Sequence, residues 1–184
     1  MRTEKEKMLA GEDFNPTDRT LTEERRKAKI LLRRFNVDHF VFDREAAIVL
    51  KELLPNAHSS LYIETPFHCD YGYNIHCGPR VYFNTNCVIL DVCSVTIGAG
   101  TLFGPGVHIY TATHPLSAEK RKVAESGKPV SIGEQCWIGG GAIILPGVTI
   151  GDNCVIGAGS VVTNDIPANH LALGNPARVH RKLE

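Results

Sequence analysis

The chain of 184 residues has no long apolar run and no excess of either charge. A membrane-spanning helix needs about 20 predominantly apolar residues, and no stretch approaches that length. Lysine and arginine together number 20, as do aspartate and glutamate, which argues against a general surface for nucleic acid or anionic membrane. We therefore expect neither nucleic acid nor a membrane among the partners.

The cysteines lack the spacing of a metal site, and the chain starts without a secretory signal. No C-x-x-C pair occurs among the six cysteines, so neither a zinc site nor any metal requirement is expected. Cys136 and Cys154 lie 18 residues apart, as do Cys69 and Cys87, which favours small buried side chains stacked in a repeat. The start, MRTEKEKMLAGEDF, has no apolar segment. Reduced thiols and the missing signal predict a cytoplasmic protein.

A six-residue repeat dominates residues 132–167. An aliphatic residue opens each block, and Gly follows it in four of the six blocks; the openers are Ile132, Ile138, Ile144, Ile150, Ile156 and Val162. Neither a helix nor an alternating strand has this period. We predict a parallel β-helix in which about 18 residues make one coil, so that Ile132 stacks on Ile150.

The remaining sequence predicts two regions, helical residues 1–60 packed on a solenoid formed by residues 61–184. Helices are expected over Thr3–Ala10, from a capping box at Thr20–Glu23 to about Phe35, and from a cap at Asp43 to a point before Pro55. The six-residue spacing from Leu61 is less regular than later in the chain. It is interrupted before Ile97 and again between Ile109 and Ile132, where a polar loop, 115–130, should protrude. About five to six coils remain, followed by a C-terminal cap with a Gly-Asn-Pro turn.

One histidine stands where a repeat meets the protruding loop. His114 lies in the segment YTATHP, and a histidine at such an edge should be accessible. Its unperturbed pKa near 6.5 suits a general base at neutral pH. His114 is therefore the strongest candidate for a catalytic residue.

The run GVHIYTATHP, the loop, and then GKPVSIGEQCWIGGGAIILPGVTIGDNCVIGAGSVVTNDIP and GNPARV resemble the maltose and galactoside O-acetyltransferases, a family of hexapeptide-repeat acetyltransferases. The resemblance extends to AGEDFNP and ERRKAK near the N-terminus. It implies a mainly β fold with a left-handed β-helix, whereas the period alone gives no hand. It also implies acetyl transfer from acetyl-CoA to a sugar hydroxyl, in a homotrimer whose active sites lie between two β-helices.

The same resemblance assigns roles to residues. It makes His114 the general base and places an N–H that stabilises the oxyanion near Gly140. The implied acceptor-binding residues are Asp70, Asn84, Asp91 and Arg25, although Asp91 and Asn84 also suit turns. Asp70 stands where the galactoside enzymes have serine, which favours a maltose-type acceptor.

The resemblance also implies a coenzyme groove formed largely by backbone groups. Its residues are Gly140, Ala158, Thr163, Asn164, Arg178 and Arg181. The two arginines suit phosphate recognition, but they also fit a solvated basic tail. Asn164 replaces a lysine common in relatives, which would weaken a phosphate contact. Trp137 fits either an interface or the core.

Three other functions remain open from the sequence. A same-fold acetyltransferase could use another acceptor, such as serine, a nodulation oligosaccharide or an antibiotic. A γ-type carbonic anhydrase would need three histidines around zinc, and the chain offers His68, His76, His108 and His114. The third possibility is a β-helix scaffold without catalysis.

Overall fold

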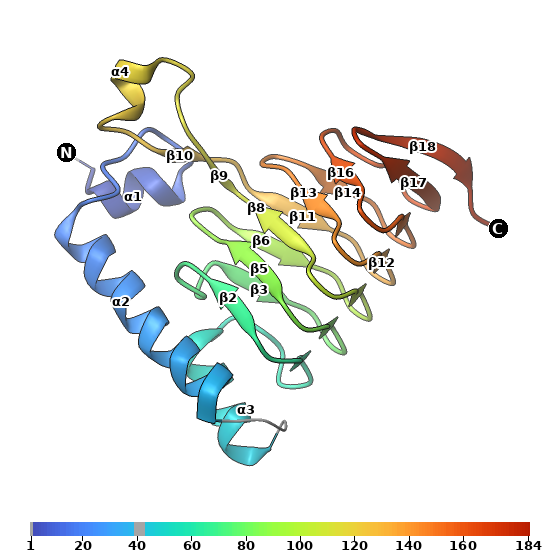
Figure 1. The fold of residues 1–184 in the computed structure, drawn as a ribbon, viewed down its shortest axis with the longest axis horizontal. Coiled ribbons are helices and arrows are strands. Elements are labelled where there is room, and N and C mark those ends of the chain that lie inside the picture. The colour runs from blue at the N-terminus through green and yellow to red at the C-terminus, as the bar shows by residue number, and fades with distance from the viewer. Residues whose placement is uncertain (1, 39–42) are drawn as a thin grey trace.

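A computed structural model describes residues 2–38 and 43–184. Short strands wind around one axis to form a triangular solenoid with three faces (Figure 1). Face one contains β1 (Tyr62–Ile63), β4 (Tyr82–Phe83), β7 (Leu102–Phe103), β12 (Trp137–Ile138), β15 (Val155–Ile156), β17 (His170–Gly174) and β18 (Ala177–Lys182). Face two contains β2 (Phe67–Cys69), β5 (Cys87–Leu90), β8 (His108–Tyr110), β13 (Ile143–Ile144) and β16 (Val161–Val162). Face three contains β3 (Ile75–Cys77), β6 (Val95–Ile97), β11 (Val130–Ile132) and β14 (Thr149–Ile150).

The predicted stacking of the repeat is confirmed. Ile132 pairs with Ile150 in parallel strands, and both side chains are buried. All the strands pair in parallel within the three faces, except for the terminal hairpin of β17 and β18, which turns through the predicted Gly-Asn-Pro segment. Since each coil buries its inward side chains only against its neighbours, the stack carries one continuous core.

The first coils are longer than the repeat predicts. Phe83 pairs with Phe103, so these coils contain 20 residues, against 18 between Ile132 and Ile150. Consequently Cys69 pairs with Ile89, and the expected stacking of Cys69 on Cys87 is wrong. The expected burial of all six cysteines as free thiols is confirmed.

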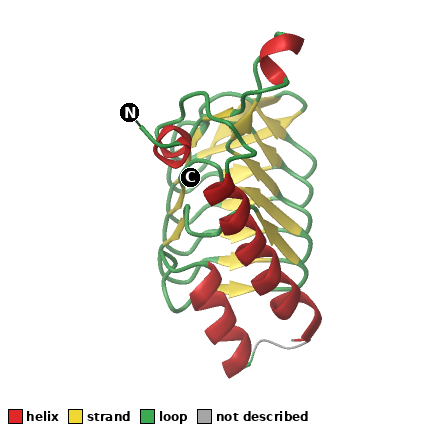
Figure 2. Cartoon of the chain, turned by 90° about the vertical axis from the view of Figure 1, so that its left-hand side faces the viewer, coloured by secondary structure: helices red, strands yellow, loops and turns green. Residues whose placement is uncertain are grey.

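Helices cover the N-terminal end of the solenoid (Figure 2). They are α1 (Glu4–Leu9), α2 (Arg19–Arg33) with a π-helical extension η1 (Arg34–Asp38), and α3 (Arg44–Leu53). Ala28 and Leu32 of α2 join the same buried cluster as the solenoid core. The domain boundary at residue 60 stays a prediction. In the described parts of the chain, no helix is long and apolar enough to cross a bilayer.

The helix caps only partly follow the sequence analysis. Asp43 caps α3 by accepting the N–H of Ala46 at 2.8 Å, as predicted. The capping box expected at Thr20–Glu23 is wrong, because α2 begins earlier and Asp18 accepts the N–H of Leu21. The carboxyl group of Asp18 precedes the first turn, where the free N–H groups of the helix lie.

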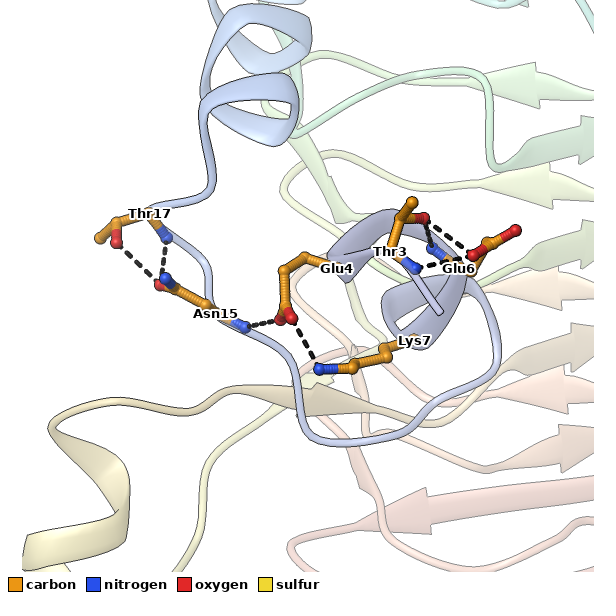
Figure 3. Close-up of polar contacts among 6 residues, drawn as sticks. All are labelled: Thr3, Glu4, Glu6, Lys7, Asn15 and Thr17. Carbon is orange, nitrogen blue, oxygen red and sulfur yellow. Dashed lines mark hydrogen bonds and ion pairs between the residues drawn. The ribbon is translucent and has the colours of Figure 1, made fainter. Parts of the chain in front are cut away.

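A capping box instead starts α1 and fixes the segment that follows it (Figure 3). Thr3 and Glu6 exchange the two capping hydrogen bonds. The Glu4 carboxylate accepts the N–H of Asn15 and a hydrogen bond from the Lys7 ammonium, each at 2.6 Å. Residues 10–17 are thereby held beside α1, where Phe14 and Pro16 contact Glu125 and Arg25.

Candidate active site

Two edges of the solenoid carry most of the predicted site residues. Edge I joins faces one and two through residues 64–66, 84–86, 104–107, 139–142 and 157–160. Edge II joins faces two and three through residues 70–74, 91–94, 111–129, 145–148 and 163–165. The extra residues of the long coils and the protruding loop all lie at edge II. The irregularities that interrupt the repeat therefore gather on one side of the molecule.

A buried carboxylate shapes the beginning of edge II. Asp91 is fully buried, and its oxygens accept the backbone N–H groups of Asp70, Tyr71 and Gly72 at 2.7–2.9 Å. Burial raises the pKa of Asp91 to about 7, and the backbone donors oppose that rise. This orientation differs from the acceptor contact expected for Asp91, because the carboxylate faces the backbone and is closed to solvent.

Arg25 reaches edge II from α2. Its guanidinium donates to the hydroxyl of Tyr71 and to the carbonyl of Pro16, each at 2.5 Å. The segment around Pro16 is the one that α1 holds in place. Arg25 is thus fixed on both sides, with its charge directed at the corner that Asp91 shapes.

The loop brings His114 to the same edge. His114 is exposed and follows β9 (Ala112–Thr113), which pairs antiparallel with β10 (Ser126–Gly127). The short helix α4 (Ala118–Arg121) comes between these two strands in the sequence and lies at the outer end of the loop (Figure 1). Glu125 exchanges two backbone hydrogen bonds with Phe14, at 2.9 and 3.1 Å. The N-terminal segment therefore positions the base of the loop.

Four charged or ionisable groups meet here. Burial raises the pKa of Glu125, whereas His114 favours the ionised carboxylate, as does Arg25. Burial also raises the pKa of Asp70, which Arg25 opposes. Glu125 is not among the residues predicted from the sequence, and its backbone bridge to Phe14 places it at this edge.

The other predicted residues do not join this cluster within one chain. Asn84 lies at edge I, where its side chain accepts the N–H of Thr85 at 2.8 Å. Gly140 and Ala158 also lie at edge I, and neither N–H donates to an acceptor within the described residues. The remaining four residues are exposed near the C-terminal end, Thr163 and Asn164 at edge II and Arg178 and Arg181 on β18.

The outward side chains of the three faces differ in polarity. Face one presents an apolar stripe in register, made of Tyr62, Tyr82, Leu102, Trp137, Val155 and Leu171. Trp137 is 57% exposed, so the core position considered for it is wrong. Face three presents exposed polar side chains, at His76, Thr96, Ser131 and Thr149. In the described residues, no group of three His, Cys, Asp or Glu side chains is placed to hold a metal ion.

Two family models match the chain. Residues 129–164 match the bacterial transferase hexapeptide, and residues 7–58 match the maltose acetyltransferase hexapeptide capping motif. Nodulation protein L from Rhizobium meliloti (strain 1021) is 53% identical over 179 residues, which cover 97% of this chain and 98% of the relative.

The chain belongs to the maltose and galactoside O-acetyltransferase family. The structure of a maltose O-acetyltransferase from Clostridium difficile 630 matches with a TM-score of 0.97 and 48% identity, covering 100% of this chain and 98% of the other. A galactoside acetyltransferase in complex with coenzyme A matches with a TM-score of 0.92 and 38% identity, covering 100% and 92%. The resemblance found in the sequence is confirmed, and the fold matches the left-handed β-helix of hexapeptide-repeat acetyltransferases.

Proposed function

We propose that this acetyltransferase moves an acetyl group from acetyl-CoA to a hydroxyl of a sugar acceptor, with His114 as the general base. The observation that carries the proposal is the group at edge II, where exposed His114 lies near Glu125, Asp70 and Arg25. Carboxylate and guanidinium groups are good hydrogen-bonding partners for sugar hydroxyls. The coenzyme seen with the galactoside relative supports acetyl-CoA as the donor.

The proposed reaction needs one base. His114 removes the proton of the acceptor hydroxyl while the hydroxyl oxygen attacks the thioester carbonyl. The tetrahedral oxyanion collapses, the carbon–sulfur bond breaks, and protonated His114 returns the proton to the departing thiolate. Alignment of the two substrates supplies much of the acceleration, because their translational and rotational freedom is already lost on binding and need not be lost in the transition state.

The free N–H of Gly140 is the proposed donor to the oxyanion. A backbone N–H already directed at the developing charge stabilises the transition state more than the ground state. The N–H of Ala158 and the side chains of Thr163 and Asn164 would contact the pantetheine arm. Among the described residues, Arg178 and Arg181 donate only to neighbouring carbonyls, so both are available for the phosphates of the coenzyme.

Because His114 and Gly140 lie on different edges of one chain, we propose a homotrimer whose sites combine edge II of one copy with edge I of the next. Asn84 would then reach the acceptor from the neighbouring copy. The apolar stripe on face one supports this assembly, since contiguous exposed apolar surface marks an interaction site. The polar outward side of face three suits solvent.

The acceptor is the finer part of the proposal. Asp70 adds a carboxylate to the candidate site at edge II, which favours a maltose-type hydroxyl acceptor over a galactoside. A panel of maltose, glucose, galactosides, chitin oligosaccharides and serine, each with acetyl-CoA, would identify it through thiol release. Thiol release with none of the sugars but with serine would contradict a sugar acceptor. The cytoplasm stays the predicted location, as six free buried cysteines suit a reducing compartment.

A further inference from the structure

A hollow lies between α2 and β2. Its volume is about 460 Å³, and we name it the α2 groove. Leu32 and Pro66 contribute its apolar surface, and Lys29, Arg33 and His68 contribute its ionisable groups. Asn36 exchanges two hydrogen bonds with the backbone of Phe67, at 2.8 and 2.9 Å. These bonds fix η1 to β2, so the groove is formed before any ligand arrives.

The groove carries charge of one sign. No acidic side chain lines it among the described residues. Of the other cations of α2, Arg19 pairs with Glu23 and Arg25 donates to Tyr71, whereas Arg26 and Lys27 make no ion pair or hydrogen bond with a described residue. Lys29 and Arg33 make neither an ion pair nor a hydrogen bond with any described residue. They are also four residues apart on one helix, and like charges at this spacing destabilise a helix. An anion between them would remove that cost.

One end of the groove, at Lys29, is directed toward the candidate site. Arg25, Lys29 and Arg33 follow one another at four-residue intervals, which places them on one side of α2 over about 12 Å. Lys29 favours the ionised form of Asp70, the carboxylate that Arg25 also faces. His68, whose side chain is exposed on β2, comes two residues before Asp70. A ligand bound near Asp70 can therefore extend along α2 toward Arg33.

We propose that the α2 groove binds an anionic group of the acceptor, a phosphate, sulfate or carboxylate, about one sugar unit away from the reacting hydroxyl. This inference rests on the proposed sugar acetyltransferase activity and specifies its substrate class. Guanidinium and ammonium groups form their strongest hydrogen bonds with such anions. The groove lies at the N-terminal end of the solenoid, whereas Arg178 and Arg181, the proposed phosphate contacts of the coenzyme, lie on β18 at the other end (Figure 1).

Matched acceptors test the inference in the intact enzyme. The pairs are glucose with its 1- and 6-phosphates, maltose with maltose 1-phosphate, and 4-methylphenyl with 4-carboxyphenyl glucoside. We expect at least one anionic member to have a kcat/KM about tenfold above that of its neutral partner. The double variant Lys29→Gln/Arg33→Gln should abolish this preference by raising KM for the anionic acceptor. KM for the neutral partner and for acetyl-CoA should not change.

The control removes two charges from another side of the same helix. Lys27→Gln/Arg34→Gln changes two exposed cations seven residues apart, neither of which lines the α2 groove, and should keep the preference. The inference is overturned if neutral sugars are acetylated and no anionic acceptor exceeds its neutral partner, or if the preference survives in Lys29→Gln/Arg33→Gln. It is also overturned if that variant raises KM for acetyl-CoA instead, since the groove would then serve the coenzyme.

A separate measurement distinguishes this inference from the proposed function. Calorimetric titration with glucose 1-phosphate, glucose 6-phosphate and maltose 1-phosphate, without acetyl-CoA, reports binding independently of catalysis. If no sugar is acetylated but one phosphate binds and loses affinity in Lys29→Gln/Arg33→Gln, the anion site stands and the proposed function fails. If neutral sugars are acetylated and no phosphate binds, the proposed function stands and the anion site fails.

Discussion

The Asp91 carboxylate accepts the backbone N–H of Asp70 across one coil, at 2.9 Å. The same oxygen accepts the N–H of Tyr71, and the second oxygen accepts that of Gly72. Three donors on one buried carboxylate fix the turn from which Asp70 and Tyr71 project. We therefore expect Asp91 to act on the proposed acceptor side of the site through the residues that it positions.

Asp91→Asn should lower stability. The amide keeps one oxygen, so at least one backbone N–H of residues 70–72 loses its acceptor inside the protein. Such a loss costs about 1–3 kcal/mol. Relative to wild type, we expect this variant to have a lower melting temperature and a raised KM for the acceptor. Its KM for acetyl-CoA should change less. The control is Asp165→Asn, which changes an exposed carboxylate that accepts one N–H, from Thr149. Equal melting temperatures for the two variants would contradict the role of Asp91.

Stability should also depend on pH through Asp91. Because burial raises its pKa to about 7, the folded protein keeps a proton that the unfolded chain releases above about pH 4. The contribution of Asp91 to the free energy of unfolding is therefore present at low pH and is lost as pH rises to about 7. Thermal melts of wild type and Asp91→Asn across this window should give a difference that shrinks with pH. A difference that grows would mean that the native carboxylate is ionised throughout.

Glycines at two edges should respond differently to substitution. A Cβ added to Gly98 would lie 2.5 Å from the backbone of Gly133 and Glu134 in the next coil. Gly98→Ala should therefore separate two coils and cost about 1–3 kcal/mol. Gly106 has φ +64° and open space around it, and Asn86 adopts a similar φ in the preceding coil. Gly106→Asn should cost less than about 1 kcal/mol, measured by urea unfolding. The reverse order would contradict the close coil contact.

The assembly should depend on the outward side chain of Trp137. Trp137→Glu places a charge in the apolar stripe, where desolvation on association would be costly. We expect the wild type to be a trimer by light scattering and this variant to be a monomer with an unchanged circular dichroism spectrum. Ser131→Glu, on the polar face three, should remain trimeric. A trimeric Trp137→Glu would place the interface elsewhere.

The repeat in residues 132–167 was enough to predict the coils, because stacked Ile132 and Ile150 recur at the coil length. The early coils do not follow this spacing. Two extra residues at edge II lengthen each of them, so that Cys69 pairs with Ile89. The period is visible in the sequence only where the turns have constant length. The same irregular turns hold the candidate site, so the part of the fold that is hardest to predict is the part proposed to carry the chemistry.

The site itself was only partly predictable. The position of His114 beside the loop follows from the break in the repeat. The inward orientation of Asp91 does not, because it depends on N–H groups from the neighbouring coil. Glu125 depends on a backbone bridge to Phe14, more than a hundred residues earlier. Long-range contacts of this kind leave no local pattern in the sequence.

His114→Ala provides the most direct test of acetyl transfer by a histidine base. Thiol release from acetyl-CoA should be measured with the best sugar acceptor, together with coenzyme binding and oligomeric state. We predict a loss of about 10²–10⁴-fold in kcat, the usual contribution of a general base, with coenzyme binding and assembly unchanged. The control His76→Ala, on the polar face three, should keep full activity. Full activity in His114→Ala would contradict the proposed mechanism.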